Sequence, residues 1–134
     1  MKVIAKTILE YVREEIEKHN IELKIVKGYK LIYDSEKCYG YFEPPLKTKK
    51  GKLALAIGEK RHVDYLWDLA HEFAHFRQWK REDPIYLKHQ IDDSIYPLLE
   101  KRTEKEAQRI FENWGLNTSK RLKNRSKKYL SKIS

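Results

Sequence analysis

The sequence predicts an α+β fold in one compact domain, and its length, composition and periodicity all support this class. The 134 residues are enough for one hydrophobic core and too few for two full-sized domains. Apolar residues make up 40% of the chain and charged residues 37%, which indicates a folded core beneath an ionised surface. We expect residues 1–117 to form this domain and residues 118–134 to form a basic C-terminal tail.

Helical and extended periodicities follow each other in the first half of the chain. Apolar residues recur at helical spacing between Val3 and Lys18, which predicts an amphipathic N-terminal helix. Residues 21–25 alternate between apolar and charged side chains, the pattern of a half-buried strand. Short extended segments are expected at residues 30–33, 38–42 and 53–57, and together these strands predict one small antiparallel or mixed sheet.

Two long helices are expected in the second half of the chain. The first covers residues 63–80, and the second covers residues 97–114, with Pro97 suited to its first turn and Gly115 to its C-terminal cap. The intervening residues 83–93 are expected to form a loop. A helix, a small sheet and two further helices in this order are typical of an α+β fold.

Cysteine content and hydropathy exclude several classes of protein. The single cysteine, Cys38, excludes an intramolecular disulfide and a zinc site built from cysteines, so a metal site would use His and carboxylate ligands. No apolar run approaches the roughly 20 residues that span a bilayer, and the N-terminus lacks a secretory signal pattern. We therefore expect no transmembrane segment and a cytoplasmic location.

The helix expected at residues 63–80 contains an HExxH motif, His71-Glu72-Phe73-Ala74-His75. Two His residues four positions apart differ by about 40° around a helix, so both imidazoles can hold one metal ion. Glu72 lies beside that face, where its carboxylate can act as general base on a water molecule that the metal activates. The motif predicts a Zn²⁺ site. The opposite side of the helix carries an apolar stripe that can pack on the core, formed by Leu66, Leu69, Phe73 and Phe76.

A third metal ligand is expected from the helix at residues 97–114. Glu100, Glu104 and Glu106 all fall at the edges of its apolar face, and periodicity does not choose among them. Asp68 lies one turn before His71 and is a candidate to orient its imidazole. A donor to the developing oxyanion is also expected, and the candidate transition-state stabilisers are His89, Tyr86 and Tyr96.

These motifs together resemble the gluzincin tribe of zincin metallopeptidases. HEFAH is followed 29 positions later by Glu104-Lys105-Glu106-Ala107-Gln108, which is similar to the second signature of that tribe, ExxA followed by Asn or Asp. The small size makes the chain most similar to minigluzincins and ImmA/IrrE-like minimal catalytic domains. The resemblance implies a zinc metalloendopeptidase with Glu104 as the third ligand, and it places Gln108 where a residue supports a ligating His.

The resemblance also implies how a peptide or protein substrate is held. In such enzymes an edge strand before the motif helix aligns the substrate by β-augmentation, and residues 53–57 occupy that place.

The basic character of the chain is concentrated in its tail. The net charge is +9, but residues 118–134 hold seven basic residues and no acidic ones, which leaves the rest of the chain at +2. If the tail is helical, one of its faces is apolar. It could be solvated, dock on its own cleft or self-associate with another copy's cleft, bind nucleic-acid phosphates, or lie on an anionic membrane. The resemblance to minigluzincins favours docking that keeps the enzyme latent.

A non-enzymatic alternative is a basic, nucleic-acid-associated regulatory protein with a structural or vestigial zinc site. Two His and one Glu leave one coordination position open, whereas structural zinc sites close all four positions, so the ligand set argues against this alternative. The ligand set therefore favours a zinc-dependent peptidase, and the resemblance to minigluzincins implies that it is produced as a latent proenzyme.

Overall fold

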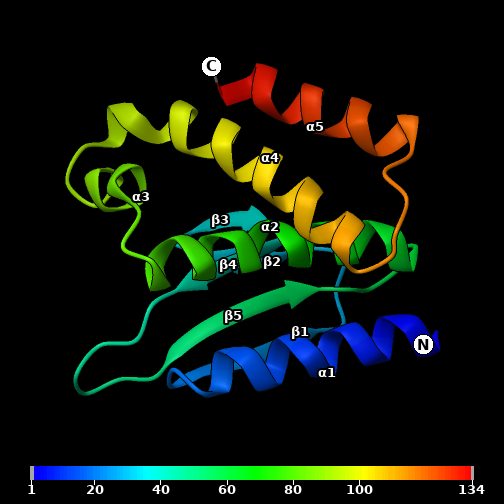
Figure 1. Ribbon diagram of the computed structural model, residues 1–134, viewed down its shortest axis with the longest axis horizontal. Coiled ribbons are helices and arrows are strands. Elements are labelled where there is room, and N and C mark those ends of the chain that lie inside the picture. Colours follow the sequence, from blue (N-terminus) through cyan, green and yellow to red (C-terminus); the bar gives the residue numbers. More distant parts are fainter. Residues whose placement is uncertain (1, 134) are drawn as a thin grey trace.

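The computed structural model describes residues 2–133 and confirms the α+β class (Figure 1). In chain order, these residues form α1 (Val3–Glu17), β1 (Ile21–Val26), β2 (Leu31–Tyr33), β3 (Glu36–Cys38), β4 (Gly40–Glu43), β5 (Gly51–Ala56), α2 (His62–Lys80), α3 (Pro84–His89), the 3₁₀ turn η1 (Asp93–Ile95), α4 (Tyr96–Asn113) and α5 (Lys120–Ile133).

The main sheet is mixed and has the strand order β1-β5-β4. β5 pairs with β1 in parallel, with Leu23 opposite Leu53, and with β4 in antiparallel orientation. The prediction that residues 53–57 form an edge strand is therefore wrong, because β5 is the central strand. Its residues are buried on both faces, as a central strand requires. The edge strand is β4, and the single strand predicted at residues 38–42 is instead the end of β3 followed by β4.

Alternation along β5 divides the core between the two faces of the sheet. Leu53 and Leu55 point into the main core beneath α1 and α2, whereas Ala54 and Ala56 pack with Leu31 of the β2–β3 hairpin on the other face. In Figure 1, α4 crosses α2 and α5 runs along the outer side of α4. Among residues 2–133, no helix combines the length and the apolar character that a bilayer crossing requires.

The predicted apolar stripe of α2 is buried, as its spacing requires. The other side of the helix meets α4, where the rings of Trp67 and Phe111 lie 5.2 Å apart in an edge-to-face contact. α4 ends before Gly115, whose φ of +84° is the left-handed conformation expected of a C-terminal cap residue. Packing of α2 between the sheet and α4 therefore fixes the helix that carries the HExxH motif.

The expectation of a loop at residues 83–93 is wrong, because α3 lies there. Asp83 caps this helix: its Oδ1 accepts hydrogen bonds from the backbone N–H groups of Ile85 (2.9 Å) and Tyr86 (3.3 Å). Pro84 occupies the first turn, where its missing N–H costs nothing. The Asp-Pro pair is a helix-start signal, but a six-residue helix is too short to show periodicity. This short helix buries Tyr86 against the motif helix.

We expect Phe111→Ala to lower the free energy of unfolding by about 3–5 kcal/mol, because it leaves a cavity between α4 and α2. Leu98→Ala on the same helix is the control, since 47% of that side chain is already exposed, and its cost should be under about 1 kcal/mol. Urea denaturation of both variants checks this. Equal destabilisation by the two changes would contradict the packing described.

Candidate metal centre

The crossing of α2 and α4 brings two imidazoles and a carboxylate together. Nε2 of His71 lies 3.3 Å from Oε1 of Glu100, and Nε2 of His75 lies 3.2 Å from Oε2 of the same carboxylate. One potential ligand atom from each of these residues lies within 4.8 Å of the others. The predicted pairing of His71 with His75 on one helix face is therefore present, with Glu100 as the carboxylate between their Nε2 atoms.

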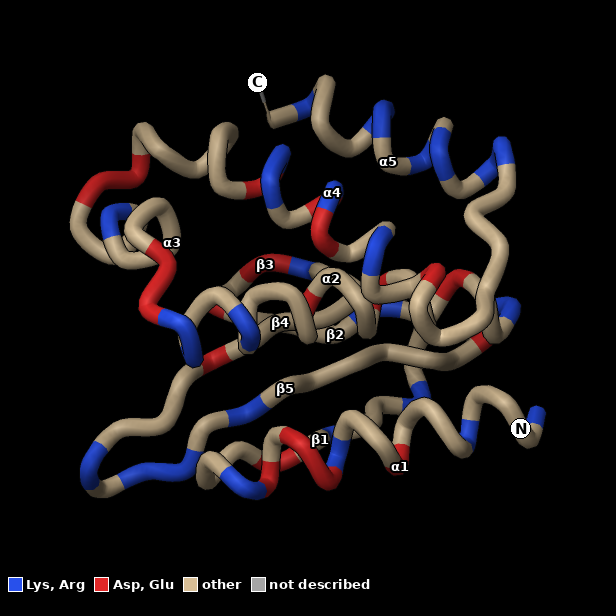
Figure 2. The backbone as a smooth tube through the Cα atoms, viewed as in Figure 1, with Lys and Arg blue, Asp and Glu red and all other residues tan. Residues whose placement is uncertain are grey.

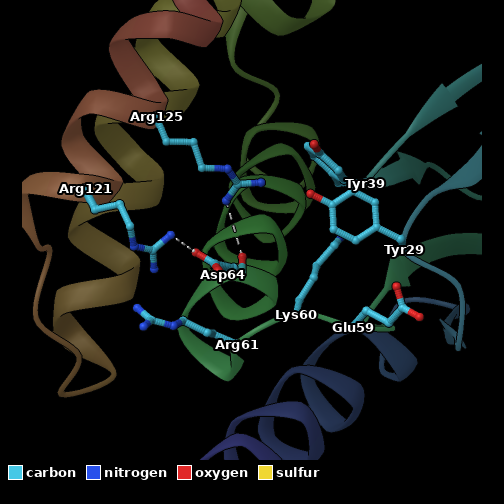
Figure 3. A pocket seen from close by; sticks show the side chains of 8 residues that line it. All are labelled: Tyr29, Tyr39, Glu59, Lys60, Arg61, Asp64, Arg121 and Arg125. Carbon is cyan, nitrogen blue, oxygen red and sulfur yellow. Dashed lines mark hydrogen bonds and ion pairs between the residues drawn. The ribbon is translucent and has the colours of Figure 1, made fainter.

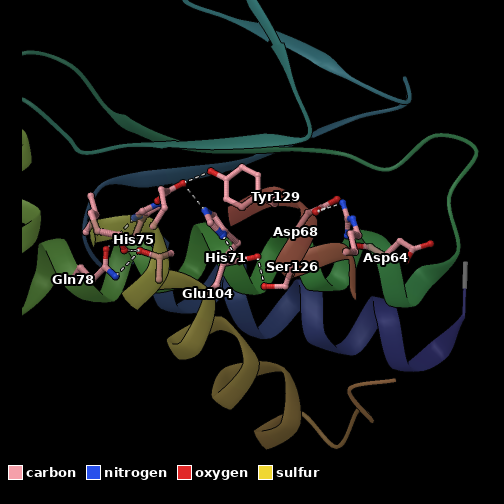
Figure 4. Close-up of polar contacts among 12 residues, drawn as sticks. Asp64, Asp68, His71, His75, Gln78, Glu104, Ser126 and Tyr129 are labelled. Atoms are coloured by element: carbon pink, nitrogen blue, oxygen red, sulfur yellow. Dashed lines mark hydrogen bonds and ion pairs between the residues drawn. The ribbon is translucent and has the colours of Figure 1, made fainter. Parts of the chain in front are cut away.

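Glu104 lies on the other side of the His71 ring. Its Oε2 accepts a hydrogen bond from Nδ1 of His71 at 2.7 Å, and its Oε1 accepts one from the Ser126 hydroxyl at 2.8 Å (Figure 4). The structure thus gives Glu104 an orienting position and gives Glu100 the position expected of the third ligand. The reason is one turn of α4: the turn carrying Glu100 faces both His residues, whereas the next turn reaches only the far nitrogen of His71. Glu106 pairs with Arg81 instead.

Hydrogen bonds to the two Nδ1 atoms determine which imidazole nitrogen is free. The Thr103 hydroxyl donates to the backbone oxygen of Leu99 and so accepts from Nε2 of Gln78, which turns Oε1 of Gln78 toward His75. Nδ1 of His75 must then donate to that oxygen, at 2.9 Å. Nδ1 of His71 likewise donates to a carboxylate. A neutral ring at either position would therefore keep its Nε2 lone pair directed at Glu100.

Two imidazole nitrogens that face one carboxylate need a positive charge between them, which a proton or a metal ion can supply. Oε2 of Glu100 is buried and has no hydrogen-bond donor among the described residues. Burial would raise the pKa of Glu100, but His71 and His75 hold it well below its usual range. Burial would lower the pKa of His71, yet Glu100, Glu104 and Glu72 raise it well above its ordinary value. Either a second proton on His71 or a metal ion can satisfy the cluster, and two imidazoles with one carboxylate could hold a divalent metal ion such as zinc.

Glu72 lies beside this cluster on α2 and is buried. Burial raises the pKa of its carboxyl, while His71 and His75 oppose the rise. Strand β4 passes close by: a Cβ on Gly40 would lie 3.2 Å from Cγ of Glu72 and 2.8 Å from the backbone oxygen of Ala54. Glycine at this position lets the edge strand approach the predicted general base.

Two residues expected to support the ligating His residues point elsewhere. Asp68 bonds Arg125 at 2.7 Å and pairs with Lys60 at 3.6 Å. Gln108 donates to Glu112 at 3.2 Å on the exposed side of α4. The orienting positions belong to Gln78 and Glu104. Gln78 stands three residues after His75, a helix-neighbour spacing that the sequence displays and that our sequence analysis did not use.

The three candidate transition-state stabilisers differ in their distance from the cluster. Tyr86 is buried with its ring centroid 6.3 Å from that of His75, and burial raises its pKa to about 12. The Tyr96 hydroxyl lies 3.0 Å from the hydroxyl of Tyr129. The His89 ring packs on the Tyr96 ring, with 5.4 Å between their centroids, so Tyr96 lies between His89 and Tyr129. Tyr86 and Tyr96 are therefore better placed than His89.

The basic tail is a helix that closes over the cluster. The Tyr129 hydroxyl donates to Oε1 of Glu100, and the Tyr129 ring lies 6.0 Å from the His71 ring (Figure 4). Burial, followed by Glu100, raises the pKa of Tyr129. Leu122 is fully buried and belongs to the main hydrophobic core. Sequence reasoning could not find the contact of Tyr129 with Glu100, because it joins residues far apart in the chain.

Comparison with known protein families, with curated proteins and with solved structures finds no match for this chain. Its functional interpretation therefore depends on the geometry of these side chains and on the motifs that the sequence displays.

The two glutamates of α4 are expected to differ in their effect on metal affinity. Glu100→Gln should weaken zinc binding by more than about 100-fold, because it removes the charge of a ligand. Glu104→Gln should weaken it by only about 10- to 100-fold, because it changes the partner of His71 Nδ1. Competition against a chromogenic chelator measures both affinities. A larger loss for Glu104→Gln would restore the assignment that the resemblance implies.

Proposed function

We propose that this protein is a zinc-dependent peptidase held in a latent state by its C-terminal helix. The observation that carries the proposal is the convergence of the Nε2 atoms of His71 and His75 on the Glu100 carboxylate, with both Nδ1 atoms occupied by acceptors. Three protein ligands with an open fourth position are the arrangement of catalytic rather than structural zinc.

The chemistry follows from the residues around that position. A bound zinc ion would polarise the scissile carbonyl and activate a water molecule. The Glu72 carboxylate takes the proton from that water and later delivers it to the nitrogen of the leaving amine. Its buried setting beside the cluster favours the first transfer, because a raised pKa makes the carboxylate a stronger base. Tyr86 and Tyr96 are the candidate donors to the developing oxyanion.

The substrate proposed is a peptide in extended conformation. β4 is the last strand of its sheet, so the backbone groups of its outer edge can pair with a further strand. β4 also passes beside Glu72, through the contact at Gly40 described above. A peptide added to this edge would run past the proposed general base. The role expected of residues 53–57 therefore passes to β4.

Latency is proposed because α5 occupies the approach to the cluster. Tyr129 bonds Glu100, Ser126 bonds Glu104, and Arg125 bonds Asp68. Arg121 adds an ion pair with Asp64 at 2.7 Å. While Tyr129 bonds Glu100, its side chain would obstruct the approach of a substrate carbonyl to His71, His75 and Glu100. Cleavage therefore requires α5 to move, and its ion pairs with α2 are among the contacts that must break.

The double variant Arg121→Glu and Arg125→Glu reverses the charge of both arginines of α5. We expect it to release α5 from α2, because the new glutamates repel Asp64 and Asp68. The matched control carries the same charge change on the outer face, Lys123→Glu and Lys127→Glu. With zinc present, hydrolysis of casein should rise at least about 10-fold in the first variant, the equivalent of about 1.4 kcal/mol in the population of the open form. It should stay at the basal level in the control.

Adding Glu72→Gln to the released variant should abolish hydrolysis while zinc content is unchanged. A released variant that binds zinc, as measured by metal analysis, yet cleaves no peptide in a Glu72-dependent way would contradict the peptidase assignment. Equal activation of the inner-face and outer-face variants would contradict latency.

A second candidate function is binding of nucleic acid, and the outer face of α5 favours it. Figure 2 shows basic residues along this helix and no acidic ones. Five exposed lysines form no ion pair within residues 2–133: Lys120, Lys123, Lys127, Lys128 and Lys132.

If this function is correct, duplex DNA should bind with an affinity that falls steeply with salt, since each phosphate contact releases a counterion. The variant Lys123→Glu and Lys127→Glu should bind more weakly by about 10-fold, as charge is reversed at two contacts. Fluorescence anisotropy at two salt concentrations measures this. An affinity for DNA that changes neither with salt concentration nor in the variant would exclude this function.

A further inference from the structure

A cavity lies between α5 and the N-terminal end of α2, apart from the His71 and His75 cluster (Figure 3). Its volume is about 500 Å³, within the range of roughly 300–1,000 Å³ typical of small-molecule sites. The tail contributes Arg121 and Arg125, and the body contributes the rest of the lining: Tyr29, Tyr39, Glu59, Lys60, Arg61 and Asp64.

The cavity holds more cationic hydrogen-bond donors than its acids use. Nη1 of Arg121 donates to Asp64 at 2.7 Å. Arg125 donates from Nη2 to Asp68 at 2.7 Å and from Nη1 to the backbone oxygen of Asp64 at 3.5 Å. Each guanidinium has five N–H groups and so keeps further donors. Arg61 is exposed and has no hydrogen bond or ion pair from its side chain among residues 2–133. Figure 3 shows Arg61 and Arg121 extended toward the same space. Three guanidiniums with unused donors therefore line one opening.

Lys60 makes the cavity electropositive without being available to a ligand itself. Its side chain is nearly inaccessible, donates to the backbone oxygen of Ala56 at 3.0 Å and pairs with Asp68 at 3.6 Å. Its Nζ lies 4.2 Å from the ring centroid of Tyr39, and Arg125 covers the same ring at 5.1 Å. These contacts fix the lysine and one arginine in place, so the positive charge is pre-organised rather than mobile.

The backbone adds to the same field. α2 begins at this cavity, and its N-cap residue, Arg61, provides no side-chain acceptor for the first N–H groups of the helix. The positive end of the helix dipole therefore points toward the guanidiniums. Tyr29 is half exposed at the same opening and offers a flat ring beside the charges.

We propose that this cavity binds a phosphate-bearing small molecule, with Arg61 from the body and Arg121 and Arg125 from the tail as its ligands. Guanidinium groups match phosphate oxygens in geometry and remain charged when partly buried, which favours phosphate over a single carboxylate. Because the ligand bridges two segments, it holds α5 on the body. This site does not depend on zinc or on peptidase activity.

The first test is titration calorimetry of the full chain with inorganic pyrophosphate, at an ionic strength kept constant with sodium chloride. Arg61→Ala should weaken binding about 10-fold, since hydrogen bonds to charged groups are lost. Arg77→Ala is the matched control, because it removes an exposed arginine from the same helix about 24 Å away and should change affinity less than 2-fold. An equal loss in both variants, or no saturable binding to the unmodified protein, would overturn the proposal.

The second test uses the unmodified protein and needs no variant to fold. Pyrophosphate should slow amide hydrogen exchange in residues 120–133 by at least 5-fold while leaving α1 unchanged, because only α5 is bridged by the ligand. Binding without protection of α5 would overturn the bridging role.

Adenosine diphosphate and adenosine, titrated in parallel, identify the source of the phosphate. Tighter binding of the nucleotide than of pyrophosphate would indicate that the adenine base stacks on the Tyr29 ring. Equal affinity would assign the site to the phosphates alone, and both results support the site. Adenosine binding as tightly as the nucleotide would overturn it.

Discussion

The candidate site depends on the contact of two imidazoles with one buried carboxylate, which a second proton on His71 or a metal ion can stabilise. The Nε2 atoms of His71 and His75 face a buried carboxylate across about 3 Å, and the opposite nitrogen of each ring is already hydrogen-bonded to an acceptor. A buried carboxylate costs several kcal/mol unless a positive charge or hydrogen bonds compensate it. The hydrogen-bond chain through Gln78 and Thr103 holds this arrangement, and the packing of α4 on α2 keeps it closed. The packing of the core therefore also fixes the positions of the side chains in the candidate site.

The C-terminal helix, α5, contacts the core and the candidate site through apolar packing, ion pairs and a hydrogen bond. Leu122 joins the main core, the two arginines pair with acids of α2, and Tyr129 reaches the carboxylate between the imidazoles. Most of these contacts are ionic or hydrogen-bonded and partly exposed, so they are weaker and more sensitive to solution conditions than apolar packing. This division suits a segment that stays folded on the body and can be moved by a competing charge.

Local patterns in the sequence predicted the long helices, the strands and the HExxH face, because each depends on residues within a few positions of one another. Which glutamate lies between the two imidazoles depended on where α4 crosses α2, and a shift of one turn would exchange the positions of Glu100 and Glu104. The sequence did not show that β4 rather than β5 lies at the edge of the sheet, because strand order is a property of the tertiary structure. Contacts of Tyr129 and Arg125 join residues dozens of positions apart, so no periodicity could display them.

The central claim is that His71, His75 and Glu100 hold one metal ion. X-ray absorption at the zinc edge, on the full chain loaded with one equivalent of zinc, tests it most directly. We predict a first coordination shell of nitrogen and oxygen at about 2.0–2.1 Å with the multiple scattering of two imidazoles, and loss of that spectrum in Glu100→Gln. A sulfur ligand at about 2.3 Å, or a zinc ion bound without imidazole, would contradict it.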